Sequence, residues 1–452
     1  MTADPPLQQR FADEMGRLLG PDFPSDIGLA VSGGGDSMAM LYLAHNWTHH
    51  FGVRLWVATV DHGLRPESAS EAFMVAEECR ILGWPHATLR WVWDHSGNVQ
   101  DAARRARLEL LDRWRGGVKH VLFAHSLDDQ AETVIMRLMR GSGVDGLAGM
   151  RASRDVVPNP IDAMPLSATE CLGDGPDGRW TPGYRIVRPC LGMSRADLRH
   201  YARVLKGRWV DDPTNQDDSF ARVRVRKMLA LLQQDGLSLA ALAETAQRMT
   251  RARDALQARL VGAVRDLSET TLPGQVLLDR DGFAALDTET QMRLLTSALC
   301  YVASSEYRPR AQASDMLLDH ILSGKGGTLH GARVIVGARQ LRVVRDTGAV
   351  HHRHSPLGSM WDGQWHIEPT HDGADANAIV RMLGEDGWRQ WLARVDRPVP
   401  VIPHNAALSL PAVWQNATLM WCPLWEDHAD YRATRYVLGR RDTGFEAFCL
   451  SH

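Results

Sequence analysis

The chain has 452 residues, and its 51 lysine and arginine residues against 54 aspartate and glutamate residues give a formal net charge of −3. At about 150 residues per domain this length allows about three domains, and the balanced charge means that a polyanionic partner has to be met by local basic patches. The six cysteines form no CxxC pair, the N-terminus has no leader pattern and no uncharged apolar run is long enough to span a membrane. These features argue against a zinc ribbon, an iron–sulfur site, a disulfide framework and a membrane protein, and they favour the cytoplasm.

The first 230 or so residues alternate apolar, strand-like runs with segments of helical periodicity. We expect strands at Ile27–Val31, Leu55–Val60, His86–Trp91 and His120–Ala124. This alternation is typical of an α/β fold, in which helices cover both faces of a parallel sheet. Because ligands of such sheets bind beyond the carboxyl ends of the strands, the residues after Val31, Val60 and Ala124 are candidates for a functional site.

A glycine-rich turn follows the first expected strand and precedes a helical pattern. It consists of Ser32, Gly33, Gly34, Gly35, Asp36 and Ser37. Small residues let a phosphate approach the backbone, and N–H groups at a helix start converge on it. The turn is neither the dinucleotide GxGxxG nor a Walker A loop, so it predicts a pyrophosphate cradle. The alternative is an ordinary strand–helix turn that Asp36 or Ser37 caps.

A polar segment, Asp61-His62-Gly63-Leu64-Arg65, follows the second expected strand directly. The guanidinium of Arg65 is suited to bind an anion or to stack on a base. The alternative is a strand-end turn in which Asp61 caps a helix after Pro66.

Carboxylates gather after the fourth expected strand, where His125 to Thr133 opens a helix. Asp129 and Glu132 lie three residues apart on one face of it, and Asp128 adds a further carboxylate. Such oxygens are suited to Mg²⁺, which commonly takes one or two carboxylates with phosphate oxygens and water. Ser126 and Asp129 also match a helix-capping pattern that needs no function, but a cap does not require the other carboxylates.

Basic residues are frequent between Arg195 and Lys227. The candidates for contact with RNA are Arg195, Arg208, Arg222, Arg224 and Arg226. The last three alternate, so they would share a face on a strand and fan out on a helix. Phosphates and an extruded base of RNA suit such a cluster, and a charged surface helix is the alternative.

The character of the chain changes beyond about residue 230. Residues 237–260 have helical spacing, and glycine turns with short apolar runs follow from Gly324. We interpret GKGGTLHG at 324–331 as a β-turn, the His351, His352 and His354 tract as a linker rather than a metal site, and the C-terminal tryptophans as core. The expected domains are a catalytic one at 1–228, a helical or mixed one at 229–350 and a small α+β one at 355–452.

Six motifs in order carry a resemblance to a known family. SGGGDS, VDHGLR, HSLDDQAET, RGSGVDGLAGM, RPCL and WVDDPTN together resemble the tRNA(Ile)-lysidine synthetases, which are PP-loop enzymes of the N-type ATP pyrophosphatases. The resemblance spans residues 27 to about 227. DPTN and RPCL stand where the family usually has DPSN and RPLL, and the Pro/Gly-rich stretch at 159–183, expected to be a surface loop, is longer than usual.

The resemblance implies a ligase that uses ATP and Mg²⁺. Its partners would be free L-lysine, a tRNA(Ile) with a CAU anticodon and a second copy of the chain in a homodimer. The wobble cytidine, C34, would be adenylated at its C2 oxygen with release of pyrophosphate, and the lysine ε-amine would then displace AMP. The product is lysidine, which changes decoding from AUG to AUA.

The resemblance also implies roles for individual residues. The glycine-rich turn and His62 would bind ATP, and Asp36 and Asp129 would hold the metal. The expected catalytic residues are Asp36, His125, Asp129, Glu132 and Arg65, with Asp129 and Glu132 at the lysine ammonium and Arg65, like Arg137, at developing phosphate charge. The C-terminal domain at 355–452 would bind tRNA.

Two other functions stay open at this point. One is another PP-loop tRNA-modifying enzyme, although the scattered cysteines argue against a thiolating one and we find no glutaminase portion. The other is a nucleotide-dependent RNA-binding protein without catalysis, which would not need the carboxylates around Asp129.

Overall fold

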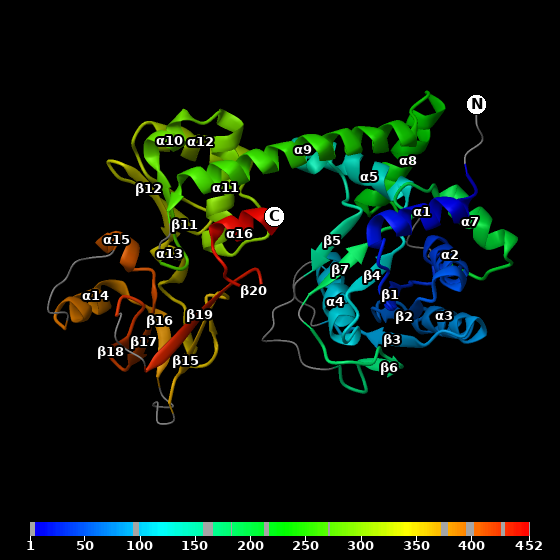
Figure 1. Cartoon of the computed structure of the whole chain (residues 1–452), viewed down its shortest axis with the longest axis horizontal. Helices are drawn as coiled ribbons and strands as arrows, with labels where there is room; N and C mark the ends of the chain where they lie inside the picture. The colour runs from blue at the N-terminus through cyan, green and yellow to red at the C-terminus, as the bar shows by residue number, and fades with distance from the viewer. Residues whose placement is uncertain are drawn as a thin grey trace. The chain divides into compact units, whose positions relative to one another are not determined.

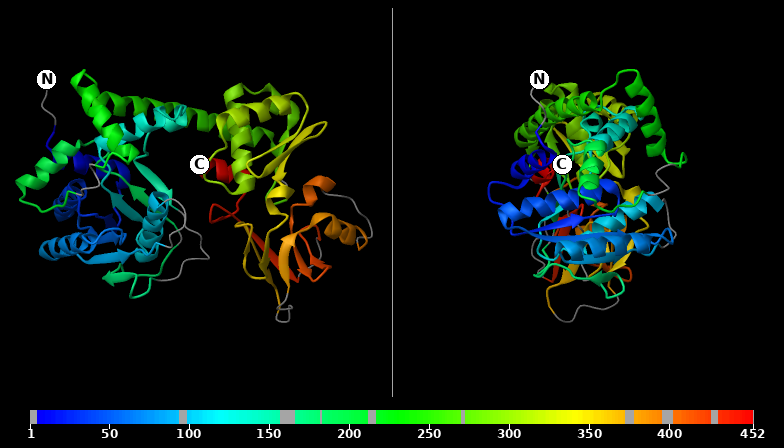
Figure 2. Two further views of the ribbon diagram at one scale, coloured as in Figure 1. Left: turned by 180° about the vertical axis from the view of Figure 1, so that it is seen from behind. Right: turned by 90° about the vertical axis from the view of Figure 1, so that its right-hand side faces the viewer.

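The computed structural model describes residues 5–93, 99–156, 166–181, 183–211, 217–269, 272–371, 378–394, 402–425 and 430–451. By its internal contacts the chain divides into two compact units, Met1–Arg253 and Asp254–His452. The long helix α9 (Leu239–Leu267) runs from the first unit into the second, and it can be followed in Figure 1 and from behind in Figure 2.

A seven-stranded sheet forms the centre of the first unit, in the order β5-β7-β4-β1-β2-β3-β6. Its five inner strands are parallel: β7 (Tyr184–Val187), β4 (His120–Phe123), β1 (Asp26–Ala30), β2 (Arg54–Asp61) and β3 (His86–Arg90). The edge strands β5 (Ser153–Val156) and β6 (Cys171–Gly173) are antiparallel to their neighbours. The predicted α/β class is confirmed, and each of the four predicted strands ends within one residue of the observed one.

Helices cover both faces of this sheet (Figure 1). The helices of the first unit are α1 (Leu7–Leu19), α2 (Gly35–Phe51), α3 (Ser68–Leu82), α4 (Val99–Trp114), α5 (Leu127–Leu138), α6 (Val144–Leu147), α7 (Arg195–Val204) and α8 (Ala221–Gln234), of which α8 packs against α5. Side chains of a strand alternate between its faces. Leu55 and Val57 therefore pack in one core with α1, α2 and α7, while Trp56 and Ala58 pack in another with α4.

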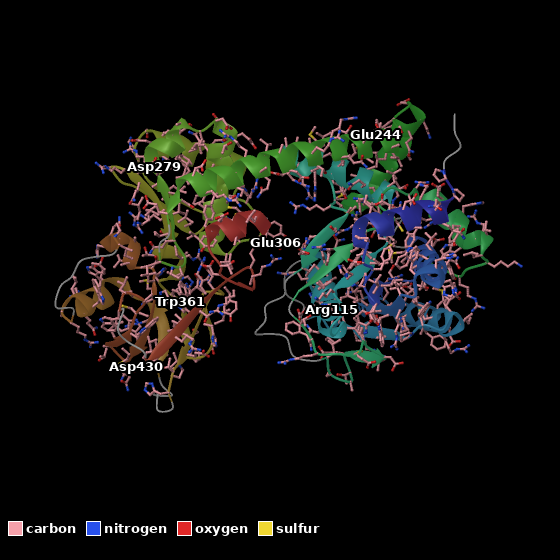
Figure 3. All side chains as sticks on the ribbon, viewed as in Figure 1. Arg115, Glu244, Asp279, Glu306, Trp361 and Asp430 are labelled. Atoms are coloured by element: carbon pink, nitrogen blue, oxygen red, sulfur yellow. The ribbon has the colours of Figure 1, made fainter. Side chains whose placement is uncertain are left out.

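The stretch at 159–183 is not a loop throughout, which corrects the sequence prediction. Residues 157–165 and 182 lie outside the described ones, but strand β6 pairs with β3 within the remainder. Glu170 accepts hydrogen bonds of 2.8 and 3.1 Å from Arg113. The fully buried Arg115, labelled in Figure 3, pairs with Asp112 at 2.7 Å, and the Trp180 indole donates to the same carboxylate at 3.1 Å. These charged contacts hold the segment against α4. The glycine and proline content of the segment, on which the loop prediction rested, does not reveal them.

The second unit contains one five-stranded and two four-stranded sheets. The first consists of β8 (Ser268–Glu269), β9 (Val276–Asp279), β10 (Gly327–Leu329), β11 (Ala332–Val336) and β12 (Gln340–Arg345). The second consists of β13 (His354–Pro356), β16 (Ile379–Met382), β17 (Pro411–Gln415) and β18 (Thr418–Trp421), and the third of β14 (Met360–Trp361), β15 (Trp365–Pro369), β19 (Tyr431–Val437) and β20 (Arg440–Arg441). The helices are α10 (Arg280–Ala285), α11 (Thr288–Ala303), α12 (Ala311–Leu322), α13 (Thr347–Val350), α14 (Gly384–Leu392), α15 (His404–Ala407) and α16 (Phe445–Ser451).

Two motifs of the second unit agree wholly or in part with the sequence prediction. GKGGTLHG contains strand β10 as well as the predicted turn, which lies at His330 and Gly331, with φ of 58° and 72°, and leads into β11. Most of the C-terminal tryptophans are core residues, and Trp361 and Trp414 are each only 1% exposed. The His351–His354 tract leads into β13, and within the described part of the chain no cluster of three or more His, Cys, Asp and Glu has the arrangement of a metal site.

The C-terminal residues share a core with the middle of the chain. Val437, Phe445 and Phe448 pack in the same buried cluster as α11, and the Arg435 guanidinium donates to the Tyr301 carbonyl at 2.6 Å. Packing therefore does not follow the expected boundary at 350–355, and the assignment of separate functions to three segments stays a prediction. Among the described helices none is both long and apolar enough to cross a membrane.

Replacing Arg115 by leucine should destabilise the protein by about 3 to 5 kcal/mol, because the Asp112 carboxylate then stays buried without its cation. Arg185→Leu is the control, since its pair with Asp155 is about half exposed and should contribute less than about 1 kcal/mol. Urea unfolding followed by tryptophan fluorescence measures both. Equal losses in the two variants would contradict the assignment.

Candidate functional site

The carboxyl ends of the five parallel strands meet at one edge of the first sheet. Chain order runs from β1 to β2 and β3 on one side and continues with β4 on the other side of β1. Ligands of open α/β sheets bind at such a reversal. The glycine-rich turn after β1 and the segment from His125 after β4 flank this point, which the sequence predicted from the strand ends alone.

The glycine-rich turn leaves the start of helix α2 without a side-chain cap. The helix begins after Gly34, and no side chain accepts a hydrogen bond there. The Ser37 hydroxyl instead donates to the Gly34 carbonyl at 2.9 Å and accepts from the Ser32 N–H at 3.2 Å. The predicted alternative of a cap by Asp36 or Ser37 is therefore wrong, and the first N–H groups of α2 point to an anion site.

One glycine of the turn is favoured by its backbone conformation and another by close packing. Gly33 has φ of 85°, a left-handed conformation that side chains disfavour. A Cβ atom on Gly35 would lie 3.2 Å from the Arg199 side chain, which would have to shift slightly to admit it.

Four acidic side chains, Asp36, Asp128, Asp129 and Glu132, surround Arg195; we call them the carboxylate cluster. The guanidinium donates to Asp36 at 3.1 Å, to Asp129 at 3.2 Å and to Glu132 at 3.4 Å, and the backbone N–H donates to Asp128 at 2.8 Å. Burial lowers the pKa of Arg195, but the carboxylates outweigh this effect and raise the pKa above its usual value. Arg195 is a half-buried member of this cluster, which the basic pattern did not reveal because its acidic partners come from distant parts of the chain. Its contact with RNA stays a prediction.

Asp36 offers a place for a cation. Its Oδ2 accepts from Arg195, whereas its Oδ1 is buried and has no hydrogen-bond partner among the residues that the structure describes. Burial raises the pKa of Asp36, and Arg195 opposes this rise. A buried carboxylate oxygen without a partner fits Mg²⁺, which would complete its shell with phosphate and water.

Asp129 has a different set of partners. Its Oδ2 accepts from the Ser126 N–H at 2.9 Å and hydroxyl at 3.0 Å, so the capping box that the sequence predicted is present. Its Oδ1 accepts from Arg195. Burial raises the pKa of Asp129, but the Ser126 N–H and Arg195 outweigh it and hold the pKa below its usual value. Asp129 is thus ionised. A metal ion or an ammonium group that binds to it would replace Arg195 at Oδ1 of Asp129.

Glu132 lies among arginines. It is 1% exposed, its Oε1 accepts from Arg226 at 2.9 Å, and Arg222 lies 3.5 Å from its Oε2. The three alternating arginines lie on helix α8, where Arg222 and Arg226 share the face toward Glu132. Arg224 donates instead to the Asp218 and Ser219 carbonyls. The structure therefore settles the open geometry of the alternating arginines. The positive surroundings of Glu132 make Asp129 the better candidate for an ammonium.

His125 contacts an arginine that the sequence interpretation did not assign to the site. Its Nδ1 accepts from Arg188 Nε at 3.1 Å. Burial and the Arg188 charge lower the pKa of His125 to about 3, so the imidazole is neutral. Arg188 belongs to the RPCL motif and follows β7 directly. Its position directly after a short apolar run is the sequence feature that could have identified it as a site residue.

Other predicted residues have partners away from the carboxylate cluster. Arg65 donates to both Glu71 oxygens at 3.0 Å, and Arg137 donates to the Gly146 and Gly149 carbonyls at 2.8 Å. His62 Nε2 lies 3.3 Å from Arg107.

Three further predictions concern turns and the basic segment. Asp61 accepts from the Gly63 N–H at 2.9 Å, whereas α3 starts at Ser68 without a side-chain cap, so the predicted helix cap is wrong. Arg208 is exposed. The DPTN motif at 212–215 lies outside the described residues.

Comparisons with known proteins match this chain to named relatives. Residues 7–232 match the model of a PP-loop domain family. The chain is 38% identical over 412 residues to the tRNA(Ile)-lysidine synthase of Ruegeria pomeroyi, which covers 89% of each chain. It is 39% identical over 335 residues to that of a Bradyrhizobium species, which covers 70% of this chain and 87% of the relative. The solved U34-tRNA thiolase NcsA from Methanococcus maripaludis, 16% identical with a TM-score of 0.40, covers 53% of this chain and 78% of its own, and a likeness this low supports no argument.

Replacing Glu132 by glutamine should loosen helix α8, because the charge that holds Arg222 and Arg226 is lost. A hydrogen bond to a charged group contributes about 1.5 to 3 kcal/mol, so amide exchange in α8 should become about tenfold faster or more. Hydrogen exchange read by mass spectrometry over residues 221–234 tests this. Glu244→Gln is the control, since its pair with Arg248 is 3.9 Å long and exposed; equal effects would refute a special role for Glu132.

Proposed function

The chain belongs to the tRNA(Ile)-lysidine synthase family, and from that premise we propose that it uses ATP to join lysine to C2 of the wobble cytidine of tRNA(Ile). The cytidine is C34 of a CAU anticodon, and the products are lysidine, AMP and pyrophosphate. The observation that carries this proposal is the uncapped start of α2 beside the carboxylate cluster. In this proposal a pyrophosphate site and acidic groups for a cationic substrate would lie together.

The chemistry explains why ATP has to be cleaved between its α- and β-phosphates. The C2 oxygen of cytosine is a poor leaving group, so it first attacks the α-phosphate and pyrophosphate leaves. The lysine ε-amine then attacks C2, and the C2–O bond breaks to release AMP. The N–H groups of α2 would hold the departing pyrophosphate, where an anion is favoured by the helix dipole.

The carboxylate cluster would serve the metal and the second substrate. Asp36 would hold Mg²⁺ through its unpartnered oxygen, and that ion would neutralise phosphate charge. Asp129 would pair with the lysine ammonium and orient the side chain, because its lowered pKa keeps it ionised; the same lowered pKa makes it a weak base for removal of the proton. We retain Glu132 as the residue that orients Arg195, Arg222 and Arg226.

The predicted contacts with tRNA differ in exposure. Arg208 and Arg224 are exposed, and the side chains of Arg222 and Arg226 are 48% and 36% exposed, so these four are candidates for phosphate contact. Arg195 is half-buried against the carboxylate cluster, and its contact with RNA stays a prediction. A tRNA-binding role for 355–452, a homodimer and a cytoplasmic location stay predictions.

Exchange of labelled pyrophosphate into ATP tests the order of the reaction. We expect exchange to need tRNA and Mg²⁺ but not lysine, and net release of AMP to need lysine as well. Exchange with lysine alone would mean that the amino acid is activated and would refute the mechanism. Binding of tRNA and ATP without any turnover would favour a non-catalytic protein, and turnover without incorporation of lysine would favour another PP-loop tRNA-modifying enzyme.

Replacing Asp36 by asparagine should reduce pyrophosphate exchange by about a hundredfold or more, because a group that stabilises phosphate charge is lost. Affinity for tRNA, measured by filter binding, should change little. Asp22→Asn, at an exposed position, is the matched control. Unreduced exchange in Asp36→Asn would remove Asp36 from the metal role.

A further inference from the structure

We infer that Arg188 fixes the tautomer of His125, so that the imidazole presents an Nε2–H donor to an oxygen of the phosphoryl group or base in the reaction. Arg188 is thus a positioning residue, and His125 acts as a neutral hydrogen-bond donor rather than as a general base. The inference rests on the proposed function for the identity of that oxygen. The tautomer itself follows from the protein alone.

The register of two parallel strands brings the residues together. Leu122 of β4 lies opposite Val187 of β7, so the next residues of each strand leave the sheet side by side. The imidazole of His125 stacks parallel to the Phe123 ring, with an interplanar angle of 4° and centroids 6.0 Å apart. This contact favours one plane for the imidazole, and the hydrogen bond from Arg188 to Nδ1 decides which ring nitrogen faces the guanidinium.

Arg188 is held as firmly as the imidazole. It is 8% exposed, its Nη1 donates to the Arg151 carbonyl at 2.7 Å, and its backbone N–H donates to the Ala152 carbonyl at 2.8 Å. Its Nε then donates to His125 Nδ1 at 3.1 Å. The planar guanidinium thus donates one hydrogen bond to a carbonyl and another to an imidazole nitrogen.

The polarity of this contact decides where the imidazole proton lies. A guanidinium has donors and no acceptor, so His125 Nδ1 must accept. A neutral imidazole has one donor and one acceptor, and the proton consequently lies on Nε2. A second proton on Nδ1 would face the Arg188 N–H, which agrees with the lowered pKa of His125. Of the other charges that face the imidazole, Asp129 favours protonation, while Arg222 and Arg107 oppose it.

This assignment excludes one role and supports another. Nε2 has no lone pair to take a proton from lysine or from the base, so His125 does not act as a base through it. An N–H donor can stabilise charge that grows on an oxygen during the transfer of the adenylate, and one such donor is commonly worth about a hundredfold to a thousandfold in rate. Because the donor is neutral, it does not repel the lysine ammonium.

Nitrogen NMR of the full-length protein labelled with ¹⁵N-histidine tests the tautomer. The signals of His125 are identified by their absence in His125→Gln. We expect the Nε2–H tautomer at neutral pH in the unmodified protein and a mixture of tautomers in Arg188→Lys, because lysine cannot serve both acceptors from one plane. Arg185→Lys, on the same strand but in a half-exposed pair with Asp155, should match the unmodified protein. An Nδ1–H tautomer or a charged imidazole in the unmodified protein would overturn the inference.

Two substitutions of His125 separate a donor from a base in pyrophosphate exchange. The Gln side-chain amide carries an N–H near the position of imidazole Nε2, whereas the Asn amide reaches only to the position of Nδ1. His125→Gln should therefore stay within about tenfold of the unmodified rate, and His125→Asn should fall by about a hundredfold or more. Equal losses in both variants would refute the donor role.

The two proposals fail in different ways. Absence of exchange in the unmodified protein would refute the proposed function, while the tautomer is read without any substrate. A wrong tautomer would refute this inference and leave the exchange reaction intact.

Discussion

The position of the Arg195 guanidinium among acidic side chains is the interaction on which the rest of the site depends. Asp36, Asp129 and Glu132 come from two helices that start after different strands, and all three direct oxygens at one point. Carboxylates held so close would repel one another without a cation between them. The guanidinium removes this repulsion and joins the starts of α2, α5 and α7. A metal ion or an ammonium group is also a cation, so the acidic groups are suited to bind one in place of the Arg195 guanidinium.

The distribution of positive charge distinguishes the surroundings of neighbouring acidic residues. Glu132 is buried against Arg222 and Arg226 as well as Arg195, so protein cations balance its charge. Among the described residues, Asp36 Oδ1 and Glu132 Oε2 are both buried without a hydrogen-bond partner, but Arg222 lies 3.5 Å from Glu132 Oε2. Burying a charge without a partner costs free energy, so Asp36 Oδ1 is the oxygen that would gain more from a bound cation.

The sequence predicted the fold better than it predicted the contacts of the site. Apolar runs bounded by turn residues located four strands, because burial on both faces requires continuous apolar residues. The same reasoning placed the glycine-rich turn and His125 at one edge. It did not find that Arg195 contacts Asp36 across 159 positions of sequence, since a basic residue beside other basic residues has the pattern of a surface. Arg188 was missed for a related reason: β7 is short, and an arginine after it carries no periodic signal.

The shared core of α11 and the C-terminal residues has a consequence for the synthesis of this protein. Phe445 and Phe448 fill part of the apolar interior formed by residues of the middle of the chain, among them Tyr301. The second unit therefore cannot complete its interior until these distant residues have been synthesised. The strands of the first unit all precede Arg188, so they are available much earlier. Folding on the ribosome is therefore expected to proceed in two stages, and the second one has to wait for the residues around Phe445.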